Sequence, residues 1–318
     1  MAKRSKPGRP PALSLAKQRD IELLRHRRGV IGVFWGNARR KGTWTDERTL
    51  VVHVRKKMPA NQLGRDLVPK RVAGFRTDVI AVGAVQHQWL DPTDLVRCDD
   101  ASRGRSTMTV LAKRQSDDRV YAVLSGHGTL PAQHGQLVTV FDPAIPMDVR
   151  ALDPAGMSFD GSLEDGLLDD TCDFSLALME TTPDDINSFH QAAGEFPPLE
   201  LRASGGDVDD EVSQFSAIRG RMMVGRIRQI AITHVLVPGF GGQDFPYFGI
   251  YFVESPDAAQ PFSVKGDSGS LVVDRRQRVL GTVVAGDPTH NLSYVLPIAG
   301  TVGALGARAK SFFRPEGS

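Results

Sequence analysis

The sequence is poor in cysteine and contains no long apolar run. Two cysteines, Cys98 and Cys172, occur in 318 residues, which excludes the multi-disulfide framework of small secreted proteins. The N-terminus lacks the apolar segment of a secretory signal peptide, and no apolar stretch approaches the length of a membrane span. No cluster of histidine, cysteine or carboxylate residues has zinc-ligand spacing. We therefore expect a cytoplasmic protein with no metal, no cofactor and no membrane partner.

The charge balance and the turn-forming residues narrow the class further. The chain carries 39 basic and 37 acidic residues, a net charge of +2, so it lacks the strongly basic character of a nucleic-acid-binding protein. The basic residues before position 12 lie among proline and glycine and indicate a solvated tail, so we expect no nucleic-acid partner. With 32 glycines, 20 prolines and 41% hydrophobic residues, the composition is typical of a turn-rich β protein.

The segment Gly-Asp-Ser-Gly-Ser-Leu-Val-Val-Asp at 266–274 contains a candidate nucleophile, Ser268, at the start of an apolar strand. Gly266 lets the backbone turn so that the N–H groups of Gly266 and Ser268 can face one developing oxyanion, and Gly269 leaves room for a substrate. Glycine, aspartate and serine also form ordinary turns. The segment alone therefore leaves both interpretations open.

Two further residues decide between them. His127 follows the β-branched and aromatic run at 120–124, which predicts a strand that ends in a small-residue turn. Asp173 begins a run with alternating apolar residues, which predicts a second strand. The order along the chain is His, Asp, Ser, with intervals of 46 and 95 residues. A serine nucleophile needs a general base and an acid that orients it, and these residues supply both.

With these motifs the sequence resembles the trypsin-like (chymotrypsin-fold, S1-type) serine proteases over about 106–305. In that family the two intervals are roughly 45 and 93 residues, whereas α/β-hydrolases have the order Ser, Asp, His and a Gly-x-Ser-x-Gly elbow that Ser268 lacks. The resemblance implies a mainly β fold with two barrels. It also implies that His127 is the general base, Asp173 orients it, Ser268 is the nucleophile, and the N–H groups of Gly266 and Ser268 form the oxyanion hole.

The region before the two expected barrels is similar to a small domain found in a group of bacterial intracellular trypsin-like peptidases. The similarity rests on the segments at 29–33, 50–57, 68–70 and 74–83. Punctuation by glycine and proline predicts strands at 29–36, 48–56 and 73–83, with a short helical stretch near 60–66. This small unit is therefore expected to be α/β.

The expected organisation follows from these segments. We predict a basic tail and short helix at 1–28, the small α/β domain at 29–90, a linker at 91–105, a protease domain at 106–305 with barrels at about 106–182 and 217–305, and a tail at 306–318. The connection at 183–216 is rich in aspartate, glycine and proline and is expected to hold one short helix near 186–193.

The resemblance also implies the walls of a substrate pocket. One wall comprises Phe262, Ser263 and Lys265, and the other comprises Val284, Ala285, Gly286 and Asp287. Trypsin itself carries an acid where this chain has Phe262, so selection of Lys or Arg is not implied. Asp287 supplies a negative charge in one interpretation and forms a plain turn in the other. No clip site precedes the first barrel, so Asp267 is expected to pair with an internal donor or a backbone amide rather than with a new N-terminus.

The sequence thus predicts an intracellular serine endopeptidase of narrow specificity that acts on a protein substrate and activates a partner protein by cleavage. The small domain either recruits that partner or covers an apolar face of a barrel. Two alternatives remain: a pseudoprotease or peptide-binding scaffold with the same fold, and an acyl-transfer enzyme that acts on esters.

Overall fold

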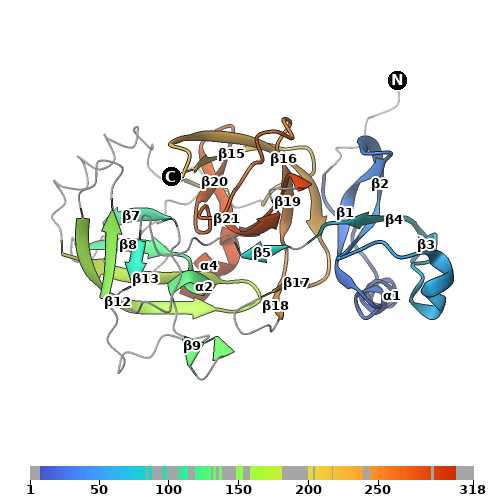
Figure 1. The fold of residues 1–318 in the computed structure, drawn as a ribbon, viewed down its shortest axis with the longest axis horizontal. Coiled ribbons are helices and arrows are strands. Elements are labelled where there is room, and N and C mark those ends of the chain that lie inside the picture. Colours follow the sequence, from blue (N-terminus) through green and yellow to red (C-terminus); the bar gives the residue numbers. More distant parts are fainter. Residues whose placement is uncertain are drawn as a thin grey trace.

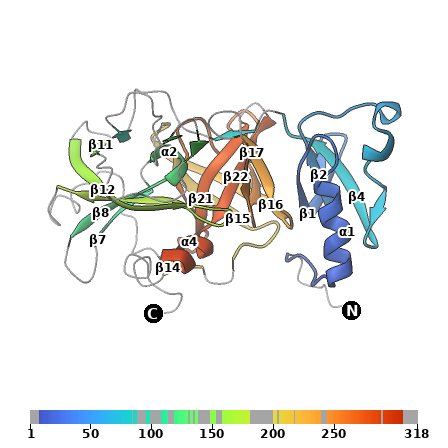
Figure 2. The ribbon, with the colours of Figure 1, turned by 90° about the horizontal axis from the view of Figure 1, so that it is seen from below.

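A computed structural model describes the chain in a series of ranges. These are residues 8–83, 85–87, 96–98, 107, 109–113, 119–129, 132–133, 136–137, 148–152, 158–180, 200–202, 205–216, 218–238, 244–287 and 290–305. Figures 1 and 2 show three neighbouring parts: an N-terminal unit in blue, a sheet in green, and a group of strands in orange and red.

The N-terminal unit is one helix packed on a small sheet. Its elements are α1 (Leu15–Arg25), β1 (Val30–Arg40), β2 (Thr43–Val54), the 3-10 helices η1 (Ala60–Gln62) and η2 (Gly64–Asp66), β3 (Arg71–Val72) and β4 (Phe75–Ala81). β1 pairs antiparallel with β2, and β2 pairs parallel with β4. Ile21 and Leu24, three residues apart on α1, are buried against this sheet because they lie on one face of the helix.

β1 and β2 are longer than the sequence predicted. They form a hairpin whose loop is Lys41 and Gly42, both with positive φ (50° and 85°). A two-residue loop with both residues in this conformation matches the twist of the flanking strands. Polar residues from Asn37 onward interrupt the apolar pattern of β1. The sequence therefore predicted that this strand would end at residue 36.

The middle of the chain forms a six-stranded antiparallel sheet in the order β6-β11-β12-β13-β8-β7. Its strands are β6 (Val96–Cys98), β7 (Val110–Lys113), β8 (Val120–Leu124), β11 (Asp148–Leu152), β12 (Ser158–Leu168) and β13 (Asp173–Met179). The other elements of this part are α2 (Gly126–Thr129) and the short pair β9 (Ala132–Gln133) and β10 (Gln136–Leu137). All five residues of β8 are buried, which fits its position between two neighbouring strands.

The last part of the chain forms a closed barrel. Neighbouring strands pair in the order β15-β20-β21-β22-β19-β16, and β15 also pairs with β16, which completes the ring. The strands are β15 (Glu211–Ser216), β16 (Arg221–Ala231), β19 (Tyr251–Glu254), β20 (Leu271–Asp274), β21 (Arg278–Asp287) and β22 (Leu292–Pro297). All six contribute buried side chains to one hydrophobic cluster, which is therefore the barrel interior. The remaining elements are β14 (Glu200–Leu201), β17 (Val235–Pro238), β18 (Asp244–Tyr247) and α4 (Ile298–Leu305).

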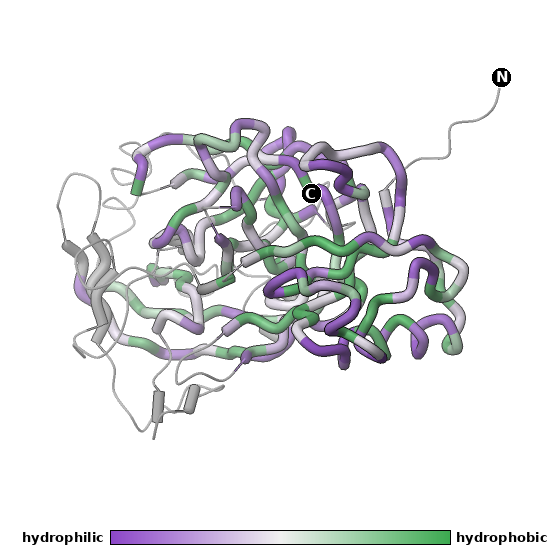
Figure 3. The backbone as a smooth tube through the Cα atoms, turned by 45° about the vertical axis from the view of Figure 1, so that its right-hand side comes forward, coloured by the Kyte–Doolittle hydropathy of each residue, from purple (hydrophilic) through white to green (hydrophobic). Residues whose placement is uncertain are grey.

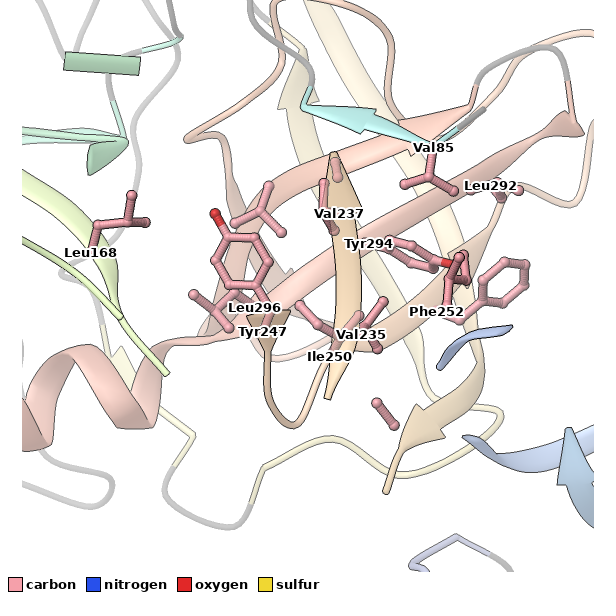
Figure 4. Close-up of a cluster of buried hydrophobic side chains, with 14 of the residues drawn as sticks. Val85, Leu168, Val235, Val237, Tyr247, Ile250, Phe252, Leu292, Tyr294 and Leu296 are labelled. Atoms are coloured by element: carbon pink, nitrogen blue, oxygen red, sulfur yellow. The ribbon is translucent and has the colours of Figure 1, made fainter. Parts of the chain in front are cut away.

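The N-terminal sheet and the barrel share one strand. Residues 221–226 of β16 pair with β15, and residues 229–231 pair with β1, so β1 extends the same edge of β16. A second link is β5 (Gln86–His87), which pairs with β21. A large apolar cluster joins residues from all three parts, and Figure 4 shows its centre around Tyr247, Tyr294 and Phe252. The three parts therefore share one core.

The predicted mainly β fold class is confirmed. The domain boundaries stay a prediction, although strands also occur in the expected linker (β6) and in the expected connection (β15). The helix expected near 186–193 and the tail at 306–318 lie outside the described residues. Short apolar stretches alternate with polar ones along the tube in Figure 3, and no helix among the described residues could span a bilayer.

Candidate active site

His127 lies in α2, the single helical turn directly after β8. The residue is 1% exposed. Its neighbour Gly126 explains why the turn can lie so close to β13: a Cβ at this position would be 2.9 Å from both the N and the O of Phe174. Only glycine permits such a close approach of two backbones. Gly126 therefore allows the His127 imidazole to lie at the start of β13.

Asp173 is the first residue of β13 and lies beside this turn. Ser175 is paired with Leu124 in the antiparallel register, so residue 173 is expected to lie opposite residue 126, next to His127. One carboxylate oxygen, Oδ1, accepts a hydrogen bond from the His127 backbone N–H at 2.8 Å. The other, Oδ2, accepts a hydrogen bond from His127 Nδ1. The acid thus fixes both the backbone and the ring of the histidine.

Ser268 reaches the same imidazole from the barrel. It lies in the turn before β20, and its Oγ donates a hydrogen bond to His127 Nε2 at 2.6 Å. This arrangement requires the tautomer with the proton on Nδ1, which the Asp173 contact favours. Figure 1 shows α2 on the side of the six-stranded sheet that faces the barrel strands. The three predicted residues therefore meet between the two halves of the molecule.

Two glycines shape the serine turn. Gly266 and Gly269 have φ of 100° and 90°, a region that favours glycine. A Cβ on Gly269 would lie 2.4 Å from the backbone O of Thr107. Thr107 also donates its N–H to the Ser268 carbonyl at 2.9 Å and its hydroxyl to the Gly266 carbonyl at 2.5 Å. A residue from the first half of the molecule thus holds the turn in place.

The amide groups of the serine turn differ in their use. The N–H groups of Asp267, Gly269 and Ser270 donate to backbone carbonyls. Within the described ranges, the N–H groups of Gly266 and Ser268 donate to no backbone acceptor. These are the two groups that the sequence predicted for an oxyanion hole. Their availability is compatible with that role.

Asp267 is buried and paired with internal donors, as the sequence predicted. Its carboxylate accepts hydrogen bonds from Ser216 Oγ at 2.7 Å and from the Val264 N–H at 2.9 Å, and Arg219 lies 3.3 Å away. Burial raises the pKa of this carboxyl above its usual value, and the hydrogen bonds from Val264 and Ser216 oppose the change. Arg219 also donates to the carbonyl of Phe262 at 3.0 Å. The loop before Ser268 is thereby tied to the turn before β16.

Tyr247 is a polar neighbour of the triad that the sequence did not reveal. Its ring is completely buried, and its hydroxyl donates to Asp173 Oδ2 at 3.1 Å. Burial raises the pKa of this phenol well above its usual value, and the Asp173 charge adds to the effect. The phenol therefore stays protonated and can serve as a donor to the carboxylate. Ser125 also approaches the histidine, with Oγ 2.8 Å from His127 Nδ1.

The residues predicted for one pocket wall have different surroundings. Phe262 is fully buried in the barrel interior, next to Gly225, and therefore packs the core in this structure. The Ser263 hydroxyl is also buried and lies 2.5 Å from that of Ser293. Lys265 is exposed. The role of these three residues in a substrate pocket therefore stays a prediction.

The other predicted wall is the end of β21. The Val284 carbonyl lies 3.3 Å from Ser268 Oγ. Ala285 and Gly286 follow and pair with β5. Asp287 is 7% exposed and accepts a hydrogen bond from His290 Nδ1 at 2.7 Å. This strand therefore runs away from the nucleophile, with the acid at its far end.

The remaining candidate chemistry is limited. Among the described residues, no group of three or more histidine, cysteine or carboxylate side chains could hold a metal ion. Burial raises the pKa of the Cys172 thiol to about 12, so this cysteine is a neutral core residue at ordinary pH. Tyr247 and Arg219 had no local signal in the sequence, because their partners are distant along the chain.

Of three comparisons with known proteins, only the one with solved structures found matches. No family model matches the chain, and no curated protein matches it. The chain is similar to the Rv3671c protease of M. tuberculosis in its active form, with 19% identity, a TM-score of 0.42, and coverage of 73% of this chain and 82% of that one. It is also similar to Deg5, with 13% identity, a TM-score of 0.40, and coverage of 66% and 84%.

Proposed function

We propose that this chain is a trypsin-like serine endopeptidase. The observation that carries the proposal is the continuous hydrogen-bonded path from Asp173 through His127 to Ser268. In this mechanism His127 Nε2 takes the proton from Ser268 Oγ as the oxygen attacks the peptide carbonyl, and Asp173 stabilises the imidazolium. The N–H groups of Gly266 and Ser268 donate hydrogen bonds to the negatively charged carbonyl oxygen.

The second half of the reaction uses the same groups. The imidazolium donates its proton to the leaving amine, which departs and leaves the acyl group on Ser268. Water then gives a proton to His127 and attacks the ester, and the acid product leaves as Ser268 regains its proton. Apart from this water, the three side chains and the two amides provide every proton transfer and every charge contact that the two steps need.

The decisive test is covalent labelling with a fluorophosphonate, which reacts with an activated serine. We expect the wild-type chain to be labelled and Ser268→Ala not to be. Ser270→Ala is the matched control, because this buried serine is two residues away and its hydroxyl has no partner among the described residues. Absence of labelling of the wild-type chain would instead favour the peptide-binding scaffold, and ester hydrolysis without peptide hydrolysis would favour the acyl-transfer enzyme.

We also propose that the enzyme has narrow specificity and acts on a protein partner recruited by the N-terminal unit. Three large apolar side chains of this unit are exposed: Leu15, Leu23 and Leu67. Exposed apolar side chains are candidate contacts for another protein. Because β1 pairs with β16, a partner docked on this unit would be held on a sheet that is joined to the barrel.

This part of the proposal is tested on the full chain in a cell lysate. We expect the wild-type chain to generate few new protein N-termini, and Leu15→Ser with Leu23→Ser to remove them without changing hydrolysis of a short peptide. Met222→Ser with Val224→Ser is the matched control, since these exposed apolar residues belong to the barrel. Many new N-termini would contradict narrow specificity, and an unchanged set in the leucine variant would contradict recruitment.

A further inference from the structure

The edge of β21 beside the nucleophile is occupied by a segment of the same chain. β22 pairs with β21 from Gly281 to Asp287 and so takes one edge of that strand. On the other edge, β20 pairs only as far as Thr282. Beyond that point β5 lies antiparallel to β21, with His87 opposite Ala285 and Gln86 opposite Gly286. Ser268 lies in the turn before β20, and its Oγ is 3.3 Å from the carbonyl of Val284, the residue just before the two that pair with β5.

The direction of β5 relates it to the active site. Because the pairing is antiparallel, the chain runs from Gly286 towards Val284 as it passes from Gln86 to His87. The Val284 carbonyl is 3.3 Å from Ser268 Oγ. An extended peptide that reaches Ser268 along this edge would have to pair with the same two residues of β21. β5 therefore occupies the backbone positions that such a peptide needs.

Neighbouring residues hold β5 in this place. Val82 and Val85 are buried in the large apolar cluster, and Figure 4 shows Val85 beside Leu292 and Tyr294. A Cβ on Gly83, which has φ of 65°, would lie 2.6 Å from Asp287 Oδ2. The segment is thus anchored against the far end of β21. The nucleophile is also covered, since Ser268 is 0% exposed.

We propose that β5 is an internal occupant of the peptide-binding edge, so that the chain restrains its own active site. This inference rests on the proposed protease function. The incoming ligand is an extended peptide segment, which gains access by displacing Gln86 and His87 from Ala285 and Gly286. Specificity then depends on a competition between two strands for one edge, one of them always present in the chain.

The first test removes the hydrogen-bond donors of β5 in the full chain. Proline lacks an N–H group, so Gln86→Pro with His87→Pro removes both donors that the strand could offer. We expect at least about a tenfold rise in kcat/KM for a tetrapeptide anilide, mainly through a lower KM, because strand pairing depends on such donors. Gln86→Ala with His87→Ala is the matched control, which keeps both N–H groups and the wild-type rate.

Fluorophosphonate labelling separates the two proposals, because this small reagent needs Ser268 but not the β21 edge. If the proline variant is labelled like the wild-type chain and yet cleaves the tetrapeptide no faster, self-restraint is refuted and the protease function stands. If no variant is labelled, the protease function fails, and the restraint of an active site fails with it.

The second test uses the wild-type chain and does not depend on a variant folding. Hydrogen exchange of the Gln86 and His87 amides is measured with and without a tetrapeptide boronic acid that bonds to Ser268. We expect exchange at these amides to accelerate at least about tenfold on binding, because the inhibitor strand displaces β5. A small aryl boronic acid, which bonds to Ser268 without reaching the edge, should leave exchange unchanged. Unchanged exchange with the tetrapeptide bound would overturn the inference.

Discussion

Two buried histidines in this chain have opposite surroundings. His127 is 1% exposed and lies between the Asp173 carboxylate and the Ser268 hydroxyl. His53, on β2, is 0% exposed and lies between Gln229 Oε1 at 2.5 Å and the Tyr294 hydroxyl at 3.0 Å. Burial is the same, but only one histidine has a charged partner.

The difference decides what each imidazole can do. Burial lowers the pKa of His53 to about 3, and the hydrogen bond to Gln229 opposes this effect only in part. His53 is therefore neutral at ordinary pH and connects β2 to β16 and β22 as a structural group. A carboxylate beside an imidazole compensates the positive charge that appears when the ring accepts a proton. In the proposed mechanism His127 transfers a proton, whereas His53 contributes to stability.

The largest expected effect comes from exchanging each histidine for alanine. His127→Ala should reduce peptide hydrolysis by at least about 10⁴-fold, because triad members act as a unit. Steady-state kinetics and thermal unfolding of the same samples check this, with the melting temperature expected to stay near that of the wild-type chain. The same loss of turnover per folded molecule in His53→Ala would contradict the distinction between a catalytic and a structural histidine.

Asp173→Asn should have the next largest effect, a reduction of about 10⁴-fold in kcat, because an amide does not hold the imidazole in the required tautomer. The matched control is Asp170→Asn, since Asp170 is three positions earlier in the chain and its carboxylate pairs with His234 at 2.9 Å instead of with His127. A mild effect of Asp173→Asn together with a severe effect of Asp170→Asn would show that the wrong acid has been assigned.

His53→Leu should lower the free energy of unfolding by about 2–4 kcal/mol, because the buried Gln229 and Tyr294 groups lose their partner. Urea unfolding at pH 7.5 measures this change. Hydrolysis per folded molecule should remain at the wild-type level, which is the control that separates a structural role from a catalytic one.

The pH dependence of stability sharpens the same comparison. The folded-state pKa of His53, about 3, lies below the unfolded value of about 6.5, so the unfolded chain binds the proton first. The stabilisation is complete above pH 6.5 and is lost as the pH falls towards 3, by about 2 kcal/mol at pH 5. Urea unfolding from pH 8 to pH 5 should show this decline in the wild-type chain and a smaller decline in His53→Leu. Equal slopes would contradict the assignment.

Tyr247→Phe should have the smallest effect. Loss of one hydrogen bond to Asp173 costs about 0.5–1.5 kcal/mol, which corresponds to a reduction in kcat of about 2–12-fold, with KM unchanged. Steady-state kinetics of the variant measures the split between kcat and KM. A rise in KM at constant kcat would indicate a packing role in place of an orienting role.

The candidate triad residues could be predicted from the sequence because each depends on a local sequence pattern. The strand-ending position of His127, the strand start at Asp173 and the glycines around Ser268 each depend on a few neighbouring residues, so turn and strand preferences predict them. The same preferences predicted the mainly β class. They missed the extension of β1 beyond residue 36, because polar residues occupy a paired strand there.

Contacts between distant segments had no such signal. Tyr247 contacts Asp173, which is 74 positions away in the sequence. Phe262, predicted to line the substrate pocket, lies in the barrel interior. The local pattern of apolar and polar residues predicts neither the pairing of β1 with β16 nor that of β5 with β21. Edge pairing uses backbone groups that every residue type except proline carries, so composition alone does not specify the partner.

The sequence by itself determined the fold class, the three candidate triad residues and the glycines that their turns require. These follow from short-range sterics and from the periodicity of buried side chains. The tertiary structure alone decided which strand completes each edge, which phenol faces the acid and which segment lies along the peptide-binding edge. Those outcomes depend on the packing of three parts of the chain around one shared core, and that packing is a property of the folded whole.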